Sequence, residues 1–298
     1  MMRILITGSN SYTGTSIREH LSAWPEKYHV DTISLRGEGW KSESFSHFDT
    51  VIHTAGIAHD TRSGVLAHGT NSADKEAYYN VNTHLAIETA RKAMREGVKH
   101  FVFMSSSIVY GKSAPIGKRK NITRGTPVSP ESYYGDSKVQ AENMLLPMDC
   151  EKFRVCVLRC PMIYGRGCKG NYPLLSKLAL MLPVFPDVNN ARSMLYVKNF
   201  AEYVRLMIDD RTHGIFWPQN GEYSRTSEIV RMIAESHRKK IILLPKCETP
   251  LKVLASFSGL VNKAFGSLTY DMSLSEYRTN YRLYALRESI MMTEGNVQ

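Results

Sequence analysis

The sequence predicts an α/β fold, a Rossmann-like doubly wound parallel sheet with a smaller C-terminal lobe. Strand-like segments alternate with helical ones through the first half of the chain, which is typical of a parallel sheet with crossover helices. A glycine-bearing turn, Thr7-Gly8-Ser9-Asn10-Ser11-Tyr12-Thr13-Gly14, joins the first strand to a helical segment. The alternation weakens after Gly165, where the lobe is expected to begin.

Each expected element follows from the spacing of its apolar residues. The expected strands are Arg3–Thr7, Val30–Leu35, Thr50–Thr54, His100–Ser105 and Arg154–Leu158. The expected helices lie near Thr13–Ala23, Val81–Gly97 and Tyr134–Leu146. Pro147 ends the last helix because proline cannot continue one.

The chain is predicted to form two parts. Residues 1–164 form the Rossmann domain, and residues 165–298 form mainly a substrate-binding lobe, part of which returns to the Rossmann domain. Such a lobe would cover the carboxyl ends of the strands, where open α/β sheets bind ligands.

Composition limits the classes of function. The formal charge of +10 favours an anionic partner, and a dinucleotide or a sugar diphosphate would satisfy it. Nucleic-acid binding is not expected, because the basic residues are scattered along the sequence and no such motif is present. The five cysteines are odd in number without CxxC spacing, so neither a disulfide framework nor a metal site is expected, and a cytoplasmic location fits best.

The first glycine-bearing turn has the spacing of a GxxGxxG loop in which Ser11 replaces the middle glycine. Glycines at this point let the backbone approach a pyrophosphate, which then lies on the helix N-terminus. A plain turn between strand and helix is the alternative. The expected cofactor contacts are Gly8, Asn10, Ser11, Tyr12, Thr13 and Gly14.

Three further features fit a dinucleotide site. Thr54-Ala55-Gly56 is a run of small residues that leaves space for an adenine ring, and Asn82 could bridge backbone groups near the catalytic centre; a tight turn and a helix cap are the alternatives. Arg36 follows the second strand, where an arginine can pair with the 2′-phosphate of NADP and an acidic residue would bind the NAD ribose. Arg36 therefore favours NADP over NAD, unless it is simply solvated.

Tyr134 and Lys138 are four residues apart and share one face of a helix. A lysine ammonium is expected to lower the pKa of the tyrosine below its usual ~10, which would make Tyr134 an acid/base near neutral pH. The spacing alone is common. The strand end Ser105-Ser106-Ser107 adds hydroxyls that could hydrogen-bond the reacting oxygen.

Together these motifs resemble the extended short-chain dehydrogenase/reductases, specifically the NAD-dependent epimerase/dehydratase family typified by UDP-glucose 4-epimerase. The resemblance rests on their order and on the further segments His53–Gly56, Asn80–Asn82, Ser105–Gly111, Tyr134–Lys138 and Leu158–Gly165. It implies a sugar epimerase that works through a keto-sugar intermediate. The same motifs would also serve an NADPH-dependent reductase of a 4-keto sugar, and a non-catalytic NADP-binding sensor is a third reading.

The resemblance also implies roles for individual residues. Tyr134 is the acid/base, Lys138 binds the nicotinamide ribose, Ser105 lies at the cofactor, and Ser106 contacts the sugar oxygen, with Ser107 as its competitor. Arg192 would bind the substrate diphosphate, and Asn171 lies in the segment that holds the nucleotide sugar. The substrate would be a nucleotide-diphosphate sugar or a lipid-linked sugar, and the protein a homodimer joined by the helices Val81–Gly97 and Tyr134–Leu146.

The sequence departs from the family in the region after the second strand. The stretch Gly37–Asp49 is too short for the extra strand and helix often found there, and Trp40 within it is expected to pack in the core rather than to contact cofactor. Two apolar stretches, Leu174–Phe185 and Leu251–Leu268, could form a membrane-surface face or pack as ordinary helices. We expect packing, because neither stretch is dense in basic residues.

Overall fold

The computed structural model describes residues 1–58, 72–257 and 259–295 and contains two compact units. The first unit comprises Met1–Gly111, Pro127–Cys160 and Ala201–Pro218. The second comprises Lys112–Thr126, Pro161–Phe200 and Gln219–Gln298. The chain thus passes between the units five times, whereas the sequence suggested a single boundary after residue 164 with a partial return.

The first unit is built on a six-stranded parallel sheet with the strand order β10-β6-β4-β3-β1-β2. Strand β2 lies on one side of β1 and β3 lies on the other, so the order of the strands reverses at β1. A ligand is expected beyond the carboxyl ends of these strands. The strands are β1 (Met2–Thr7), β2 (Tyr28–Ile33), β3 (Thr50–His53), β4 (His100–Ser106), β6 (Arg154–Cys160) and β10 (Gly214–Phe216).

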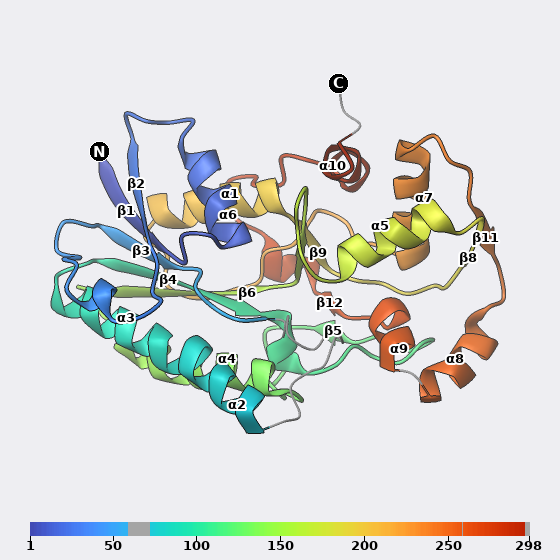
Figure 1. Cartoon of the computed structure of the whole chain (residues 1–298), viewed down its shortest axis with the longest axis horizontal. Helices are drawn as coiled ribbons and strands as arrows, with labels where there is room; N and C mark the ends of the chain where they lie inside the picture. Colours follow the sequence, from blue (N-terminus) through green and yellow to red (C-terminus); the bar gives the residue numbers. More distant parts are fainter. Residues whose placement is uncertain (59–71, 258, 296–298) are drawn as a thin grey trace. The chain divides into compact units, whose positions relative to one another are not determined.

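Helices cover both faces of this sheet, as a doubly wound fold requires (Figure 1). In the view of Figure 1, α1 and α6 lie above the sheet and α3 and α4 below it. The helical elements connecting its strands are α1 (Tyr12–Leu21), η1 (Gly39–Lys41), α2 (Ser72–Tyr78), η2 (Tyr79–His84), α3 (Leu85–Arg95), η3 (Ser107–Tyr110), α4 (Tyr133–Leu145), η4 (Leu146–Met148) and α6 (Val197–Asp209).

The core beneath α3 and α4 consists of aligned rows of side chains. Leu5, Val51, Phe101 and Val155 are register partners across four adjacent strands, and all four are buried in one hydrophobic cluster. A helix covers each face, so the strands are apolar on both faces and lack the alternation of a half-exposed sheet.

The second unit contains three two-stranded parallel sheets, β11-β8, β12-β5 and β7-β9. No helix of the described chain is long and apolar enough to cross a membrane. The elements of this unit are β5 (Asn121–Ile122), β7 (Met162–Tyr164), α5 (Asn171–Met181), β8 (Val184–Pro186), β9 (Met194–Tyr196), α7 (Thr226–Ser236), β11 (Ile242–Leu244), α8 (Glu248–Phe257), α9 (Gly259–Phe265), β12 (Thr269–Tyr270), η5 (Met272–Ser275) and α10 (Leu286–Thr293).

The structure confirms the predicted fold class, and all five expected strands and three expected helices are present within a few residues of their expected ends. The stretch Gly37–Asp49 forms a single 3₁₀ turn, Gly39–Lys41, so β2 remains the edge of the sheet. Trp40 packs in the core as expected, with 3% of its surface exposed and its ring 6.4 Å from that of Phe45.

Candidate active site

The glycine turn after β1 holds the backbone of two segments close together. Gly8 has φ of +81°, a conformation that residues with a side chain rarely adopt. A Cβ at this position would lie 3.0 Å from Cα of Ala55. The turn therefore requires glycine here, and it brings the end of β1 against the segment after β3.

Ser11 has a specific structural role in this turn. Its Oγ accepts a hydrogen bond from the Gly14 amide at 3.1 Å and so caps the N-terminus of α1. Ser11 Oγ also lies 2.5 Å from Thr54 Oγ1, which donates to the Thr7 carbonyl at 2.6 Å. The serine that replaces the middle glycine thus ties the turn to both strands.

The geometry of the turn fits the pyrophosphate of a dinucleotide. Among the described residues, the first turn of α1 carries no acidic side chain, so the positive end of its dipole has no counter-charge there. Asn10 is exposed, and Tyr12 and Thr13 are half-buried. Gly56 adds space further along, since a Cβ there would lie 3.1 Å from Asn82 Oδ1 and 3.5 Å from Lys138 Nζ.

Asn82 bridges backbone groups, as the sequence suggested. It lies in the π-helical segment η2, a distortion that often occurs at functional sites. Its Oδ1 accepts from the Ile57 amide and its Nδ2 donates to the Ile57 carbonyl, both at 2.9 Å. Nδ2 also contacts Ser137 Oγ at 3.2 Å, so Asn82 joins the segment after β3 to α4.

Tyr134 lies in the first turn of α4, and Ser132 caps this helix by accepting from the Gly135 amide at 3.1 Å. The ring centroid of Tyr134 is 6.0 Å from that of Tyr78. Burial raises the pKa of Tyr134 to about 12, and a hydrogen bond with Ser106 acts in the opposite direction. The prediction of a lowered tyrosine pKa is therefore wrong for the protein without its cofactor, because desolvation outweighs the hydrogen bond with Ser106.

Lys138 is buried beside Tyr134 on the same helix, with 5% of its surface exposed. Its Nζ donates to the Met104 carbonyl at 2.8 Å and lies 4.7 Å from the centroid of the Phe103 ring. Burial lowers the pKa of Lys138 to about 8. The ammonium group is thus hydrogen-bonded to the end of β4, at the carboxyl edge of the sheet.

The three consecutive serines at the end of β4 differ in their contacts. The Ser105 hydroxyl donates to Glu142 Oε1 in the interior of the first unit. Ser106 caps the turn η3 and hydrogen-bonds Tyr134. Ser107 is half-buried. The geometry therefore favours Ser106 over Ser107 as the partner of Tyr134, and it directs Ser105 away from them.

Sequence reasoning missed a buried polar network beneath these serines. Arg159 Nη2 donates to Glu142 Oε2 at 2.6 Å, and Arg159 Nη1 donates to the Tyr110 hydroxyl at 2.7 Å. Trp217 Nε1 donates to the same hydroxyl at 2.7 Å. Glu142 follows Lys138 by four residues, which places both on one helix face, so its spacing could have revealed it.

The remaining predicted residues occupy different surroundings. Arg36 is exposed after β2, with its backbone amide 3.3 Å from Ser34 Oγ. Asn171 begins α5 in the second unit and is half-buried.

Arg192 also lies in the second unit, where its Nη1 donates to the carbonyls of Lys263 and Ala264 at the end of α9. Burial lowers the pKa of its guanidinium to about 10. Arg192 thus caps α9, and its contact with a diphosphate stays a prediction.

Two curated proteins are similar to this chain over most of its length. A UDP-glucose 4-epimerase from Vibrio cholerae is 28% identical over 299 residues, which cover 91% of this chain and 87% of the relative. The N-acetyl-alpha-D-glucosaminyl-diphospho-ditrans,octacis-undecaprenol 4-epimerase of Escherichia coli O157:H7 is 24% identical over 259 residues, covering 80% and 73%.

Solved structures show the same fold. UDP-glucuronic acid 4-epimerase from Bacillus cereus in complex with NAD matches with a TM-score of 0.74 at 16% identity, over 99% of this chain and 98% of the other. RMD from Pseudomonas aeruginosa complexed with NADPH matches with a TM-score of 0.73 at 17% identity, over 99% of both chains. The family model described as "NAD dependent epimerase/dehydratase family" matches residues 4–216, and the chain therefore belongs to this family.

Proposed function

We propose that the protein is an NAD(P)-dependent nucleotide-sugar epimerase of the 4-epimerase type. One observation carries the proposal: Tyr134 and Lys138 lie on one helix, with Ser106 hydrogen-bonded to Tyr134 and the Lys138 ammonium attached to the end of β4. A Cβ at Gly56 would lie 3.5 Å from Lys138 Nζ, so this group lies close to the segment that packs against the glycine turn. The arrangement thus places a group that can transfer a proton next to a turn that can bind a dinucleotide.

The names of the relatives support the substrate class. One is a UDP-glucose 4-epimerase and another acts on a sugar diphosphate carried by undecaprenol. The substrate of this chain is accordingly a sugar with a free hydroxyl, held on a nucleoside diphosphate or on a lipid diphosphate.

A bound nicotinamide would supply the hydride acceptor and donor. The chain's own residues would manage the proton of the sugar hydroxyl. Ser106 would hydrogen-bond the reacting oxygen and hold it against the Tyr134 hydroxyl. Tyr134 would take the proton when the hydroxyl is oxidised and return it when the keto group is reduced, which is general acid–base catalysis at one oxygen atom.

Lys138 and Asn82 would prepare the site for this exchange. Tyr134, with a pKa of about 12, is protonated at neutral pH, so it is ready to donate to a keto oxygen. To accept a proton it needs a nearby positive charge, and Lys138 is mainly charged below its pKa of about 8. Asn82 joins Ile57 to α4 and so holds the segment after β3 in a fixed position relative to Tyr134.

We also propose that Arg36 selects NADP. The first acidic side chain after β2, Glu38, is paired with Lys41 at 2.7 Å, which makes it a poor ligand for a ribose hydroxyl. Arg36→Gln should weaken NADPH binding by about ten- to a hundredfold and leave NADH binding unchanged. Arg91→Gln, at another exposed arginine, is the control in a titration followed by cofactor fluorescence.

Replacing Tyr134 by Phe tests the catalytic assignment. We expect turnover of a UDP-sugar to fall by about 10²–10⁴-fold with cofactor affinity retained, because only the phenolic oxygen is removed. A variant with normal turnover would contradict the proposal. A wild-type protein that binds dinucleotide but turns over no sugar would favour a cofactor-binding sensor.

A second candidate is a reductase of a nucleotide- or lipid-linked 4-keto sugar. Two observations favour it, the protonated state of Tyr134 and the exposed Arg36 after β2. Mass spectrometry of the dinucleotide released from the denatured protein separates the two. Near-stoichiometric NAD would indicate a cofactor retained through turnover, as an epimerase needs, and an empty protein that prefers NADPH would indicate the reductase.

We place the protein in the cytoplasm. The support is that Cys150, Cys156, Cys160, Cys168 and Cys247 are all free thiols, which a reducing compartment maintains.

A further inference from the structure

Helix α8 of the second unit presents an apolar face to solvent. Pro250, Val253, Leu254 and Phe257 follow the i, i+3, i+4, i+7 spacing of a single helix face. The exposed fractions are 60% for Val253, 52% for Leu254 and 85% for Phe257, and none of the described residues of α8 is buried. The expectation that Leu251–Leu268 packs as an ordinary helix is therefore wrong for α8, although Phe265 in α9 is buried; residue 258 lies outside the described residues.

The surface around α8 is strongly basic. The segment Lys112–Thr126 contains five basic residues and no acidic one, and Lys246–Lys263 contains three basic residues and one acidic residue, Glu248. These two segments together account for +7 of the formal charge of +10. We call the two segments the basic pair. Most of the net charge thus lies in two segments of the second unit.

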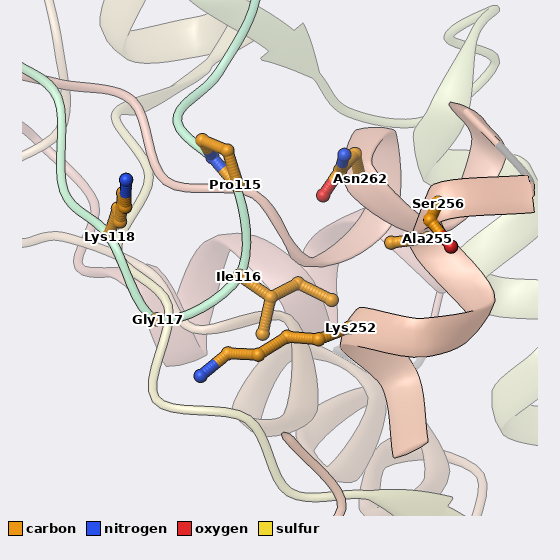
Figure 2. A pocket seen from close by; sticks show the side chains of 8 residues that line it. All are labelled: Pro115, Ile116, Gly117, Lys118, Lys252, Ala255, Ser256 and Asn262. Carbon is orange, nitrogen blue, oxygen red and sulfur yellow. The ribbon is translucent and has the colours of Figure 1, made fainter. Parts of the chain in front are cut away.

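The basic pair is contiguous in space. The loop Pro115–Lys118 faces α8 and α9 across an open pocket of about 480 Å³, lined also by Lys252, Ala255, Ser256 and Asn262 (Figure 2). In Figure 2 the Lys252 side chain extends from α8 toward Gly117, and a Cβ at Gly117 would lie 2.7 Å from Lys252 Nζ. Lysines therefore flank the polar side of α8, while its apolar face is exposed.

We propose that α8 and the basic pair form a peripheral binding surface for anionic phospholipid bilayers. An amphipathic helix of this kind lies in the plane of the membrane, with its apolar side chains in the acyl boundary and its basic flank at the phosphates. Each basic side chain near an anionic membrane adds favourable electrostatic energy. The proposal does not depend on the reaction at Tyr134.

Other occupants fit this surface less well. A second copy of the chain would bring the same positive charge against itself, and like charges across an interface oppose association. Nucleic acid would satisfy the basic residues, but its phosphates gain nothing from Val253 and Leu254. An anionic bilayer satisfies both the charge and the apolar side chains.

Vesicle flotation with the full-length protein tests the surface. The protein should float with phosphatidylcholine–phosphatidylglycerol vesicles and remain unbound with phosphatidylcholine vesicles, and added salt should weaken the binding. The triple variant Val253→Ser, Leu254→Ser, Phe257→Ser should lose about a hundredfold in partition. Neutralising Lys118 and Arg119 to Gln should cost about thirtyfold.

Matched controls separate this surface from general effects of charge and hydrophobicity. Leu283→Ser removes an exposed apolar side chain elsewhere, and Lys99→Gln with Lys152→Gln removes two exposed charges in the first unit. These variants should float like the wild type. All of the variants change exposed residues, so their unfolding temperature and turnover of a soluble UDP-sugar should match those of the wild type.

Failure of the wild type to float with anionic vesicles would overturn the proposal and leave the surface to an acidic protein partner. Flotation of the triple variant equal to that of its control would overturn the role of α8. A protein that floats but turns over no sugar would count against the proposed reaction alone.

Discussion

Lys138 is a buried cation that donates a hydrogen bond to a neutral carbonyl, that of Met104. Desolvation lowers its pKa from 10.5 to about 8. This shift corresponds to about 3 kcal/mol by which the folded protein disfavours the charged amine. The site therefore retains a destabilising residue, as expected where a charge serves function rather than stability.

Replacing Lys138 by Met should stabilise the protein while reducing turnover. We expect the free energy of unfolding at pH 7 to rise by about 2 kcal/mol, since the relief of desolvation exceeds the lost hydrogen bond. The difference in stability between this variant and the wild type should shrink as the pH rises from 8 to 10.5. In this range Lys138 of the folded wild type is already neutral while the unfolded chain still binds the proton, so the wild-type protein becomes more stable. Urea denaturation at stepped pH measures this, with Lys99→Met as the exposed control, and a destabilised K138M would contradict it.

The sequence located these residues better than it described their surroundings. The spacing of Tyr134 and Lys138 correctly placed both on one helix face. Their pKa values depend on burial and on contacts such as the Met104 carbonyl, and no linear pattern encodes these. Ser106 and Ser107 could not be told apart in sequence, because the directions of their side chains depend on how the chain turns at the end of β4.

Several elements of the first unit meet at the salt bridge between Glu142 of α4 and Arg159 of β6. Both are nearly inaccessible, at 2% and 8% exposure. Through Ser105 and Tyr110 the pair reaches the end of β4 and the turn η3. The network therefore positions the helix that carries Tyr134, although Glu142 lies outside the motifs that identified the site.

Breaking this pair should cost far more than replacing it. Glu142→Leu leaves the Arg159 charge buried and should destabilise the protein by about 3–5 kcal/mol. The double variant Glu142→Leu, Arg159→Met should recover most of that loss, because the uncompensated charge is gone. A double-mutant cycle by chemical denaturation checks this, and additive losses would show that the pair is not coupled.

Helices and strands with a strong apolar periodicity were predicted well. Segments whose shape depends on hydrogen bonds to distant parts of the chain were not predicted. The strands of the central sheet match their predicted positions because each is a short apolar run between polar segments. The π-helical segment Tyr79–His84 has no such signature. Its distortion goes with contacts of Asn82 and Thr83 to Ile57 and Ser137.

At the scale of the molecule, the central sheet of the first unit buries two uncharged histidines. Burial lowers the pKa of His53 to about 3 and that of His100 to about 4. The unfolded chain takes up these protons near pH 6.5 and the folded protein does not, so stability is lost as the pH falls from 6.5 toward 4.

The expected loss is about 1.4 kcal/mol per pH unit for each histidine across that window. Glu202, with its pKa lowered to about 2, adds a loss only below about pH 4.5. His100→Gln should remove about half of the slope, and His47→Gln, at an exposed position, should leave it unchanged. A flat stability profile between pH 6.5 and 4.5 would contradict the assignment.

We further predict a homodimer through α3 and α4, whose exposed faces include Met94 and Met144, 41% and 46% accessible. Light scattering at micromolar concentration should give twice the chain mass of 33.8 kDa. Replacing both methionines by Glu should give the monomer, and a monomeric wild type would rule out this interface.

The passage of the chain between its two units has a consequence for its synthesis on the ribosome. Strand β10 forms the edge of the six-stranded sheet, beside β6, yet Ala201–Pro218 follows the whole of Pro161–Phe200 of the other unit. Trp217, which hydrogen-bonds Tyr110, is equally late. A nascent chain cannot complete its nucleotide-binding sheet until Phe216 has emerged, so part of the second unit is synthesised before the first unit can finish folding.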